Sequence, residues 1–76
     1  MKTTIISSDY YNAFYVDGIL KHEAKPDYLN AKTLLTIFPN SEYYGVPYDL
    51  YDQLLDGDGY PEHLKDFDLS RCDRFR

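Results

Sequence analysis

The sequence predicts an α+β fold, with a small antiparallel sheet of three or four strands and one main helix across a face. Three observations predict it. Residues 2–7 form a short segment rich in β-branched side chains, which predicts a strand. Residues 13–23 predict two strands around Asp-Gly, the preferred pair for a tight hairpin turn. Residues 27–38 then carry apolar side chains at helical spacing. One or two short helices are expected near the C-terminal side.

The central hairpin is expected to turn at Asp17-Gly18, because both central positions of a type I′ turn need positive φ and these residues tolerate it. The turn predicts the cross-strand pairs Val16–Ile19, Tyr15–Leu20 and Phe14–Lys21. Alternation then places Phe14, Val16 and Ile19 on one face of the sheet and Tyr15, Leu20 and His22 on the other. One face should meet the helix, and the other should keep Tyr and Lys at its rim.

The main helix is expected over residues 27–38. Asp27 follows Pro26 and suits the N-cap, since its carboxylate can accept a backbone N–H of the first turn. Pro39-Asn40 should stop the helix. The apolar stripe that should pack on the sheet consists of Tyr28, Ala31, Leu34, Leu35 and Phe38.

Shorter elements are expected after this helix: an edge strand at residues 43–46, a second helix at residues 47–57, and a turn at residues 61–67 anchored by Leu64 and Phe67. Pro47 suits the first helical position, and Gly57 suits the C-terminal cap. With 76 residues, the chain should form a single small domain over residues 1–76, with residues 71–76 as a frayed tail.

The charge is unevenly distributed along the chain. The net charge is −5, and residues 39–70 carry eight acidic side chains against Lys65 alone, whereas residues 71–76 are net positive. An anionic middle argues against direct binding to nucleic acid, where neutralising phosphates supplies most of the affinity. It suits a basic protein surface instead, although a merely solubilising acidic surface has the same composition.

The acidic middle is also rich in tyrosine, and it supplies the candidate partner-binding residues. Tyrosine offers a large contact area at low entropic cost, and carboxylates around the rings would pair with Arg and Lys of a partner. If that partner grips nucleic acid, the carboxylates could stand in for phosphates. Alternatively, half of the tyrosines belong to the core and the acids are only solvated. The candidates are Tyr43, Tyr44, Tyr48, Asp49, Tyr51, Asp52, Asp56, Asp58 and Glu62.

No catalytic motif is found, so a non-enzymatic protein without cofactor or metal is expected. Neither His22 nor His63 has a triad-like context. The stretch from Asp56 to Glu62 alternates possible oxygen donors, but it lacks the residues that an EF-hand loop needs at its fifth, sixth and twelfth positions. Asp-Gly-Asp-Gly is better interpreted as a helix cap and a tight turn.

The expected compartment is the cytoplasm. Cys72 is the only cysteine, so an internal disulfide is impossible and a reducing environment is favoured. The first residues lack the apolar centre of a signal peptide, and no stretch approaches the roughly 20 apolar residues of a membrane span. Arg71 and Arg74 could lower the pKa of Cys72, but a lone cysteine in a tail is more often inert.

The hairpin, the helix and a late Pro-Glu-x-Leu-x-Asp turn together resemble short orphan proteins of phages and mobile elements. The matching residues are Tyr15, Asp17, Gly18, Glu23, Leu34, Leu35, Pro61, Glu62, Leu64 and Asp66. The resemblance implies an α+β fold and a viral or mobile-element origin. It also implies a protein that inhibits host machinery or host defence in the host cytoplasm, as anti-CRISPR proteins do.

These observations lead to one expected function and two alternatives. The expected function is a monomeric or homodimeric binding module that occludes a basic site, such as a nucleic-acid-binding site, on a larger host protein. The first alternative is a homo-oligomeric accessory or structural phage protein. The second is a binder that sequesters a small ligand.

Overall fold

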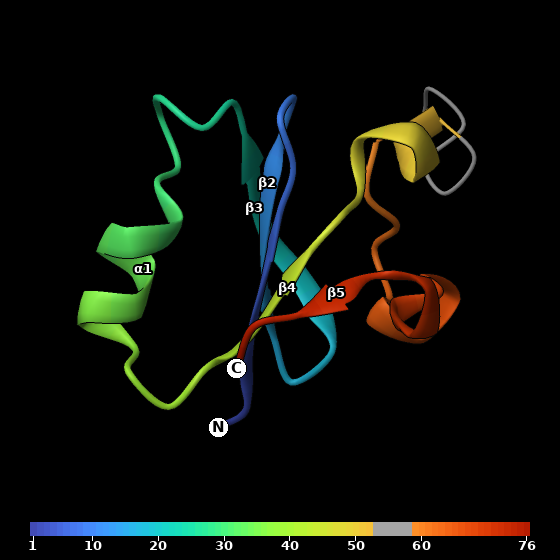
Figure 1. Cartoon of the computed structure of the whole chain (residues 1–76). Coiled ribbons are helices and arrows are strands. Elements are labelled where there is room, and N and C mark those ends of the chain that lie inside the picture. Colours follow the sequence, from blue (N-terminus) through green and yellow to red (C-terminus); the bar gives the residue numbers. More distant parts are fainter. Residues whose placement is uncertain (53–58) are drawn as a thin grey trace.

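The computed structural model describes residues 1–52 and 59–76 (Figure 1). It confirms the α+β class. The strands are β1 (Thr3–Ser7), β2 (Asn12–Val16), β3 (Ile19–Ala24), β4 (Glu42–Gly45) and β5 (Asp73–Arg74). The helical elements are α1 (Ala31–Ile37) and the short 3-10 turns η1 (Tyr48–Leu50), η2 (Leu64–Asp66) and η3 (Leu69–Arg71).

The sheet is mixed, and in the described part of the chain it has five strands in the order β3-β2-β1-β4-β5. The expected antiparallel sheet of three or four strands is therefore wrong. β1 pairs antiparallel with β2 but parallel with β4, and β4 pairs antiparallel with β5. The parallel pair arises because α1 carries the chain across the sheet from the end of β3 to the start of β4, so that β4 runs in the same direction as β3. Since β1 and β3 both run antiparallel to β2, β4 is also parallel to β1. The segment at residues 43–46, expected at an edge, lies inside the sheet.

The hairpin of β2 and β3 forms around the predicted turn, with φ of 51° at Asp17 and 81° at Gly18. The pairs Val16–Ile19 and Tyr15–Leu20 are confirmed. The third pair is wrong, because the register shifts between Phe14 and Tyr15 and His22 lies opposite Phe14. A β-bulge of this kind inserts one extra residue and turns the strand locally.

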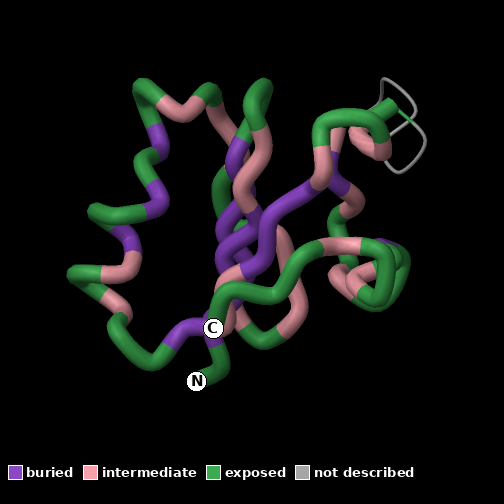
Figure 2. Tube along the Cα trace, in the orientation of Figure 1, coloured by how far each residue is buried: buried purple, intermediate pink, exposed green. Residues whose placement is uncertain are grey.

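Both faces of the sheet are covered. Ile5 and Ile6 are fully buried and belong to different core clusters, as expected for successive residues of a strand. The cluster under α1 contains Ile5, Phe14, Leu29, Ala31 and Leu34. The cluster on the opposite face contains Ile6, Ala13, Tyr15, Val46, Tyr60 and Phe67. Figure 1 shows α1 on one side of the strands and residues 60–72 on the other, and Figure 2 shows the buried residues concentrated along the strands between them.

The position of Tyr15 differs from the expectation for the sheet face that carries Tyr15 and Leu20. Its side chain was expected at a solvent-facing rim, but it is 0% exposed. Its hydroxyl donates a hydrogen bond of 2.5 Å to the carbonyl oxygen of Pro61. The predicted anchors of the covering segment are confirmed, because Phe67 is buried and Leu64 packs against the same cluster.

The main helix is shorter than expected and begins at Ala31 rather than after Asp27. The N-cap is Asn30, whose side-chain oxygen accepts two backbone N–H groups of the first turn. The preceding residues form a turn instead, which leaves Tyr28 81% exposed and buries Leu29. The expected stripe is otherwise confirmed, since Ala31 and Leu34 are buried and Leu35 and Phe38 pack against them.

The last residues are paired with the sheet, which differs from the frayed tail expected for residues 71–76. Arg74 lies opposite Tyr44, and Asp73 lies opposite Gly45. The ring of Phe75 contacts Tyr43, with 5.0 Å between ring centroids. A Cβ atom at Gly45 would lie 2.5 Å from this ring, so glycine leaves the space that Phe75 occupies.

The helix expected at residues 47–57 begins as η1, and Tyr51 and Asp52 are helical after it. Tyr48, Asp49 and Asp52 are exposed, whereas Leu50 and Tyr51 are partly buried, as the helical phase predicts. The remainder of this helix and its cap at Gly57 lie outside the described residues.

Candidate functional site

Tyrosines and carboxylates gather at one end of the sheet, where the β1–β2 loop meets η1. Figure 1 shows this loop and η1 at the same end of the molecule, above the ends of the strands. Ring contacts across the two segments place them together. We call this surface the tyrosine–carboxylate face, and it consists of Asp9, Tyr10, Tyr48, Asp49, Tyr51 and Asp52.

The rings of this face are held against each other. The Tyr10 ring lies 4.7 Å from the Tyr51 ring and 6.1 Å from the Tyr48 ring, centroid to centroid. Tyr48 is 70% exposed and Tyr10 44% exposed, whereas Tyr51 packs partly into the core. Because Tyr51 anchors the group, the two outer rings are presented to solvent at a low further entropic cost on binding.

The β1–β2 loop that carries Asp9 and Tyr10 is fixed by local hydrogen bonds. The Ser8 hydroxyl accepts the backbone N–H groups of Tyr10 and Tyr11 at 3.2 and 2.9 Å. It also donates to the carbonyl oxygen of Tyr11 at 2.6 Å. The hydroxyl of Tyr60 donates to the same carbonyl at 2.7 Å. Serine is typical of such turns because its hydroxyl can bond nearby backbone groups.

The surroundings of Tyr10 and Tyr51 raise the pKa of both hydroxyl groups. A side-chain hydrogen bond with Tyr48 is the main cause that raises the pKa of Tyr10, followed by partial desolvation and the negative charges of Asp52 and Asp9. Burial is the main cause that raises the pKa of Tyr51. Both hydroxyl groups therefore remain hydrogen-bond donors at neutral pH.

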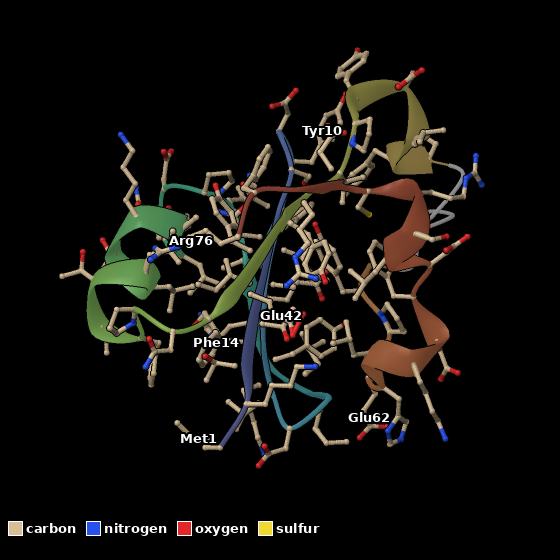
Figure 3. The ribbon with its side chains drawn as sticks, turned by 60° about the horizontal axis from the view of Figure 1, so that its bottom comes forward. Met1, Tyr10, Phe14, Glu42, Glu62 and Arg76 are labelled. Atoms are coloured by element: carbon tan, nitrogen blue, oxygen red, sulfur yellow. The ribbon has the colours of Figure 1, made fainter. Side chains whose placement is uncertain are left out.

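The structure brings together four of the nine candidate residues: Tyr48, Asp49, Tyr51 and Asp52. Glu62 lies elsewhere, and Figure 3 shows it at the opposite end of the molecule from Tyr10. Tyr44 is buried, and Tyr43 is half-buried against Phe75. Asp56 and Asp58 lie outside the described residues.

Asp9 and Tyr10 are absent from the residues predicted to bind a partner, because both lie outside the acidic middle of the sequence. A signal was present, since an acid and two tyrosines stand together between two strands. A turn needs small or polar residues, and exposed rings at such a place are not required for folding. That surplus of aromatic side chains could have indicated a surface role.

Glu42 belongs to a separate charge network. Its carboxylate lies 2.9 Å from Lys2 Nζ and 4.0 Å from Arg74, and it accepts the Tyr44 hydroxyl at 2.9 Å. The hydrogen bond from Lys2 is the main cause that lowers the pKa of Glu42. The guanidinium of Arg74 also lies 5.6 Å from the centroid of the Tyr44 ring. This carboxylate is therefore engaged within the chain and does not join the tyrosine–carboxylate face.

The described residues contain no group of three or more His, Cys, Asp or Glu side chains that could hold a metal ion. His22 and His63 are both exposed, and His63 Nε2 lies 3.9 Å from Glu62, far from the tyrosine–carboxylate face. None of the helices in this part of the chain is long and apolar enough to cross a bilayer.

Cys72 is expected to react slowly with thiol reagents. Burial is the main cause that raises the pKa of its thiol, to about 11. The thiolate fraction at pH 7 is then on the order of one in ten thousand, against about one in thirty for an ordinary thiol. Iodoacetamide should therefore alkylate the folded protein at least about tenfold more slowly than free cysteine.

Mass spectrometry of samples quenched over time would measure this rate. The rate should rise as the pH increases toward the pKa, because the thiolate is the reacting form. Unfolding the chain in urea should restore ordinary reactivity. Equal rates for the folded and the unfolded chain would contradict the assigned burial.

Comparison with protein-family models, curated proteins and solved structures finds no match for this chain. Its class therefore follows from its own geometry. It is a small α+β protein with a mixed sheet covered on both faces, and it exposes a tyrosine–carboxylate face at one end.

Proposed function

We propose that this chain is a non-enzymatic binding module whose tyrosine–carboxylate face covers a basic site on a larger protein. The observation that carries the proposal is the apposition of Tyr10 and Tyr48, two exposed and mutually stacked rings, beside Asp9, Asp49 and Asp52. Large exposed rings that the core does not need are a common mark of an interaction surface.

The two residue types have different physical roles in this proposal. The rings supply contact area that is desolvated on binding, and they mainly slow dissociation. The carboxylates, on a chain with a net charge of −5, attract a basic partner and mainly speed association. Screening by salt should weaken the second contribution more than the first.

The proposed partner is a host protein that uses its basic site to hold nucleic acid. Carboxylates spaced along an exposed surface can occupy the positions of backbone phosphates. The resemblance to short phage and mobile-element proteins favours a host target that is inhibited when this site is covered. An anti-defence role of the anti-CRISPR kind is one form of such inhibition.

The test uses paired charge reversals. The double variant Asp49→Lys, Asp52→Lys changes the face, and Glu62→Lys, Asp66→Lys makes the same change in net charge at exposed positions outside the face. Proteins captured from a host lysate by the wild-type chain would be identified, and their association and dissociation rates measured at two salt concentrations.

The first variant should slow association about tenfold or more at low salt, whereas the second should have a much smaller effect. Tyr48→Ala should mainly speed dissociation. Circular dichroism would verify that each variant is folded. If the captured protein binds both charge variants equally, the face is not the working surface. A wild-type chain that captures only its own copies would support the homo-oligomeric alternative.

A further inference from the structure

A hollow of about 460 Å³ lies beside Tyr10, between the β1–β2 loop and the β3–α1 connection. Figure 1 shows these two segments next to each other at the end of the sheet that carries the tyrosine–carboxylate face. The hollow is lined by Asp9, Tyr10, Tyr11, Lys25, Pro26 and Asp27. The proposed function uses neither Tyr11 nor the three lining residues of the β3–α1 connection, Lys25, Pro26 and Asp27.

The two walls of the hollow are tied together. The side-chain amide of Asn12 donates a hydrogen bond of 2.8 Å to the carbonyl oxygen of Leu29, which joins the end of the first loop to the second connection. Asn12 is buried, so water does not compete for this bond. The Tyr60 hydroxyl donates a hydrogen bond of 2.7 Å to the Tyr11 carbonyl oxygen and so fixes the first wall. The hollow is therefore largely formed before any ligand binds.

Tyr10 links the hollow to the tyrosine–carboxylate face. Its ring contacts Tyr48 and Tyr51, and the same residue lines the hollow together with Asp9. A partner lying over the face therefore has this concave site within reach of its side chains.

The lining chemistry suits a flat cation. Two exposed carboxylates, Asp9 and Asp27, stand near the half-exposed rings of Tyr10 and Tyr11. A guanidinium group can stack on an aromatic ring and donate parallel hydrogen bonds to a carboxylate. An ammonium group is more strongly hydrated and offers a point charge instead of a fork of donors.

We propose that the hollow receives an arginine side chain of the partner, which inserts when that partner lies on the tyrosine–carboxylate face. This inference rests on the proposed function and names the side chain that the surface selects. Lys25 lines the same hollow and supplies the opposing charge. It lowers the attraction for the incoming guanidinium, and its removal should strengthen binding.

The probe is a short glycine–serine peptide with a single central arginine, compared with peptides that carry lysine or citrulline at that position. Citrulline keeps the shape of arginine without its charge. Amide and ring signals of the intact protein would be followed by nuclear magnetic resonance during titration. The arginine peptide should bind about five times more tightly than the lysine peptide, because it adds stacking and a second hydrogen bond. The citrulline peptide should bind at least about tenfold more weakly than arginine.

Two matched lysine variants locate the site. Lys25→Met and Lys65→Met change the net charge equally, but only Lys25 lines the hollow. Lys25→Met should tighten arginine binding about threefold or more, whereas Lys65→Met should leave it almost unchanged, because screening weakens a distant exposed charge. Asp9→Asn together with Asp27→Asn should weaken binding.

Equal binding of the arginine and lysine peptides, or equal effects of the two lysine variants, would overturn the inference and leave only general electrostatic attraction. Absence of measurable binding by the arginine peptide would overturn it as well. These outcomes are separate from the test of the proposed function, which measures binding of the captured protein to the Asp49 and Asp52 variants. If binding of the captured protein depends on those aspartates but the arginine peptide does not bind, the proposed function stands and the arginine site is wrong.

Discussion

Tyr15→Ala is expected to remove a large share of the free energy of unfolding at 25 °C. The Tyr15 side chain is fully buried between the sheet and the covering segment, and its hydroxyl bonds the Pro61 carbonyl. Removing a buried aromatic ring costs about 3–5 kcal/mol. A chain of 76 residues has a total stability of roughly 4–11 kcal/mol at about 0.05–0.15 kcal/mol per residue. The loss is therefore a large share of the whole.

Urea unfolding followed by circular dichroism would measure this change, with Tyr15→Phe and Tyr28→Ala as controls. Tyr15→Phe keeps the ring but leaves the Pro61 carbonyl without its donor, and it should cost about 1–3 kcal/mol. Tyr28→Ala removes an exposed ring and should change stability by less than about 0.5 kcal/mol. If Tyr15→Ala and Tyr28→Ala were equally stable, the conclusion that residues 60–72 cover the second face of the sheet would be wrong.

Leu34→Ala is expected to have the second largest effect, about 2–5 kcal/mol. Leu34 is 8% exposed and packs with Ile5 and Phe14 under α1. Its neighbour Leu35 is only partly buried, so Leu35→Ala should cost at least about 1 kcal/mol less than Leu34→Ala. The pair therefore tests the rotation of the helix about its axis and not only its presence.

Thermal and urea unfolding of both variants would give the difference in free energy. Thr33→Ala, at an exposed position of the same helix, is the control for changes in helix propensity. A larger loss for Leu35→Ala than for Leu34→Ala would show that another face of the helix packs on the sheet.

Local chemistry made much of the fold predictable. The Asp17-Gly18 turn, the first strand, and the anchors Leu64 and Phe67 all follow from nearby residues, and the structure bears them out. The start of α1 was less predictable because Asp27 and Asn30 can both cap a helix. Only packing decides between them, and the arrangement that buries Leu29 uses Asn30.

The parallel pairing of β1 with β4 could not be predicted from the sequence pattern. These strands are separated by the whole hairpin and α1, and a four-residue segment with two consecutive tyrosines does not indicate which strand it pairs with. The tyrosine–carboxylate face likewise combines a local feature that the sequence indicates with a long-range contact that it does not. Helical spacing accounts for the exposure of Tyr48, Asp49 and Asp52, but the approach of Tyr10 to η1 is a tertiary contact that this spacing does not contain.

The pairing of segments along the outer strands has a consequence for how the molecule meets other chains. Beside β3, the Leu20 N–H donates to the Glu62 carbonyl and the Leu64 N–H donates to the Gly18 carbonyl, each at 2.8 Å. Beside β4, residues 73–76 supply the backbone partners.

Exposed strand edges are the usual templates for aggregation and for peptides that add a strand to a sheet. Here much of that backbone is already engaged by segments distant in sequence. Association by strand addition is therefore disfavoured at these positions, which fits the proposal that a partner is bound by side chains at the end of the sheet.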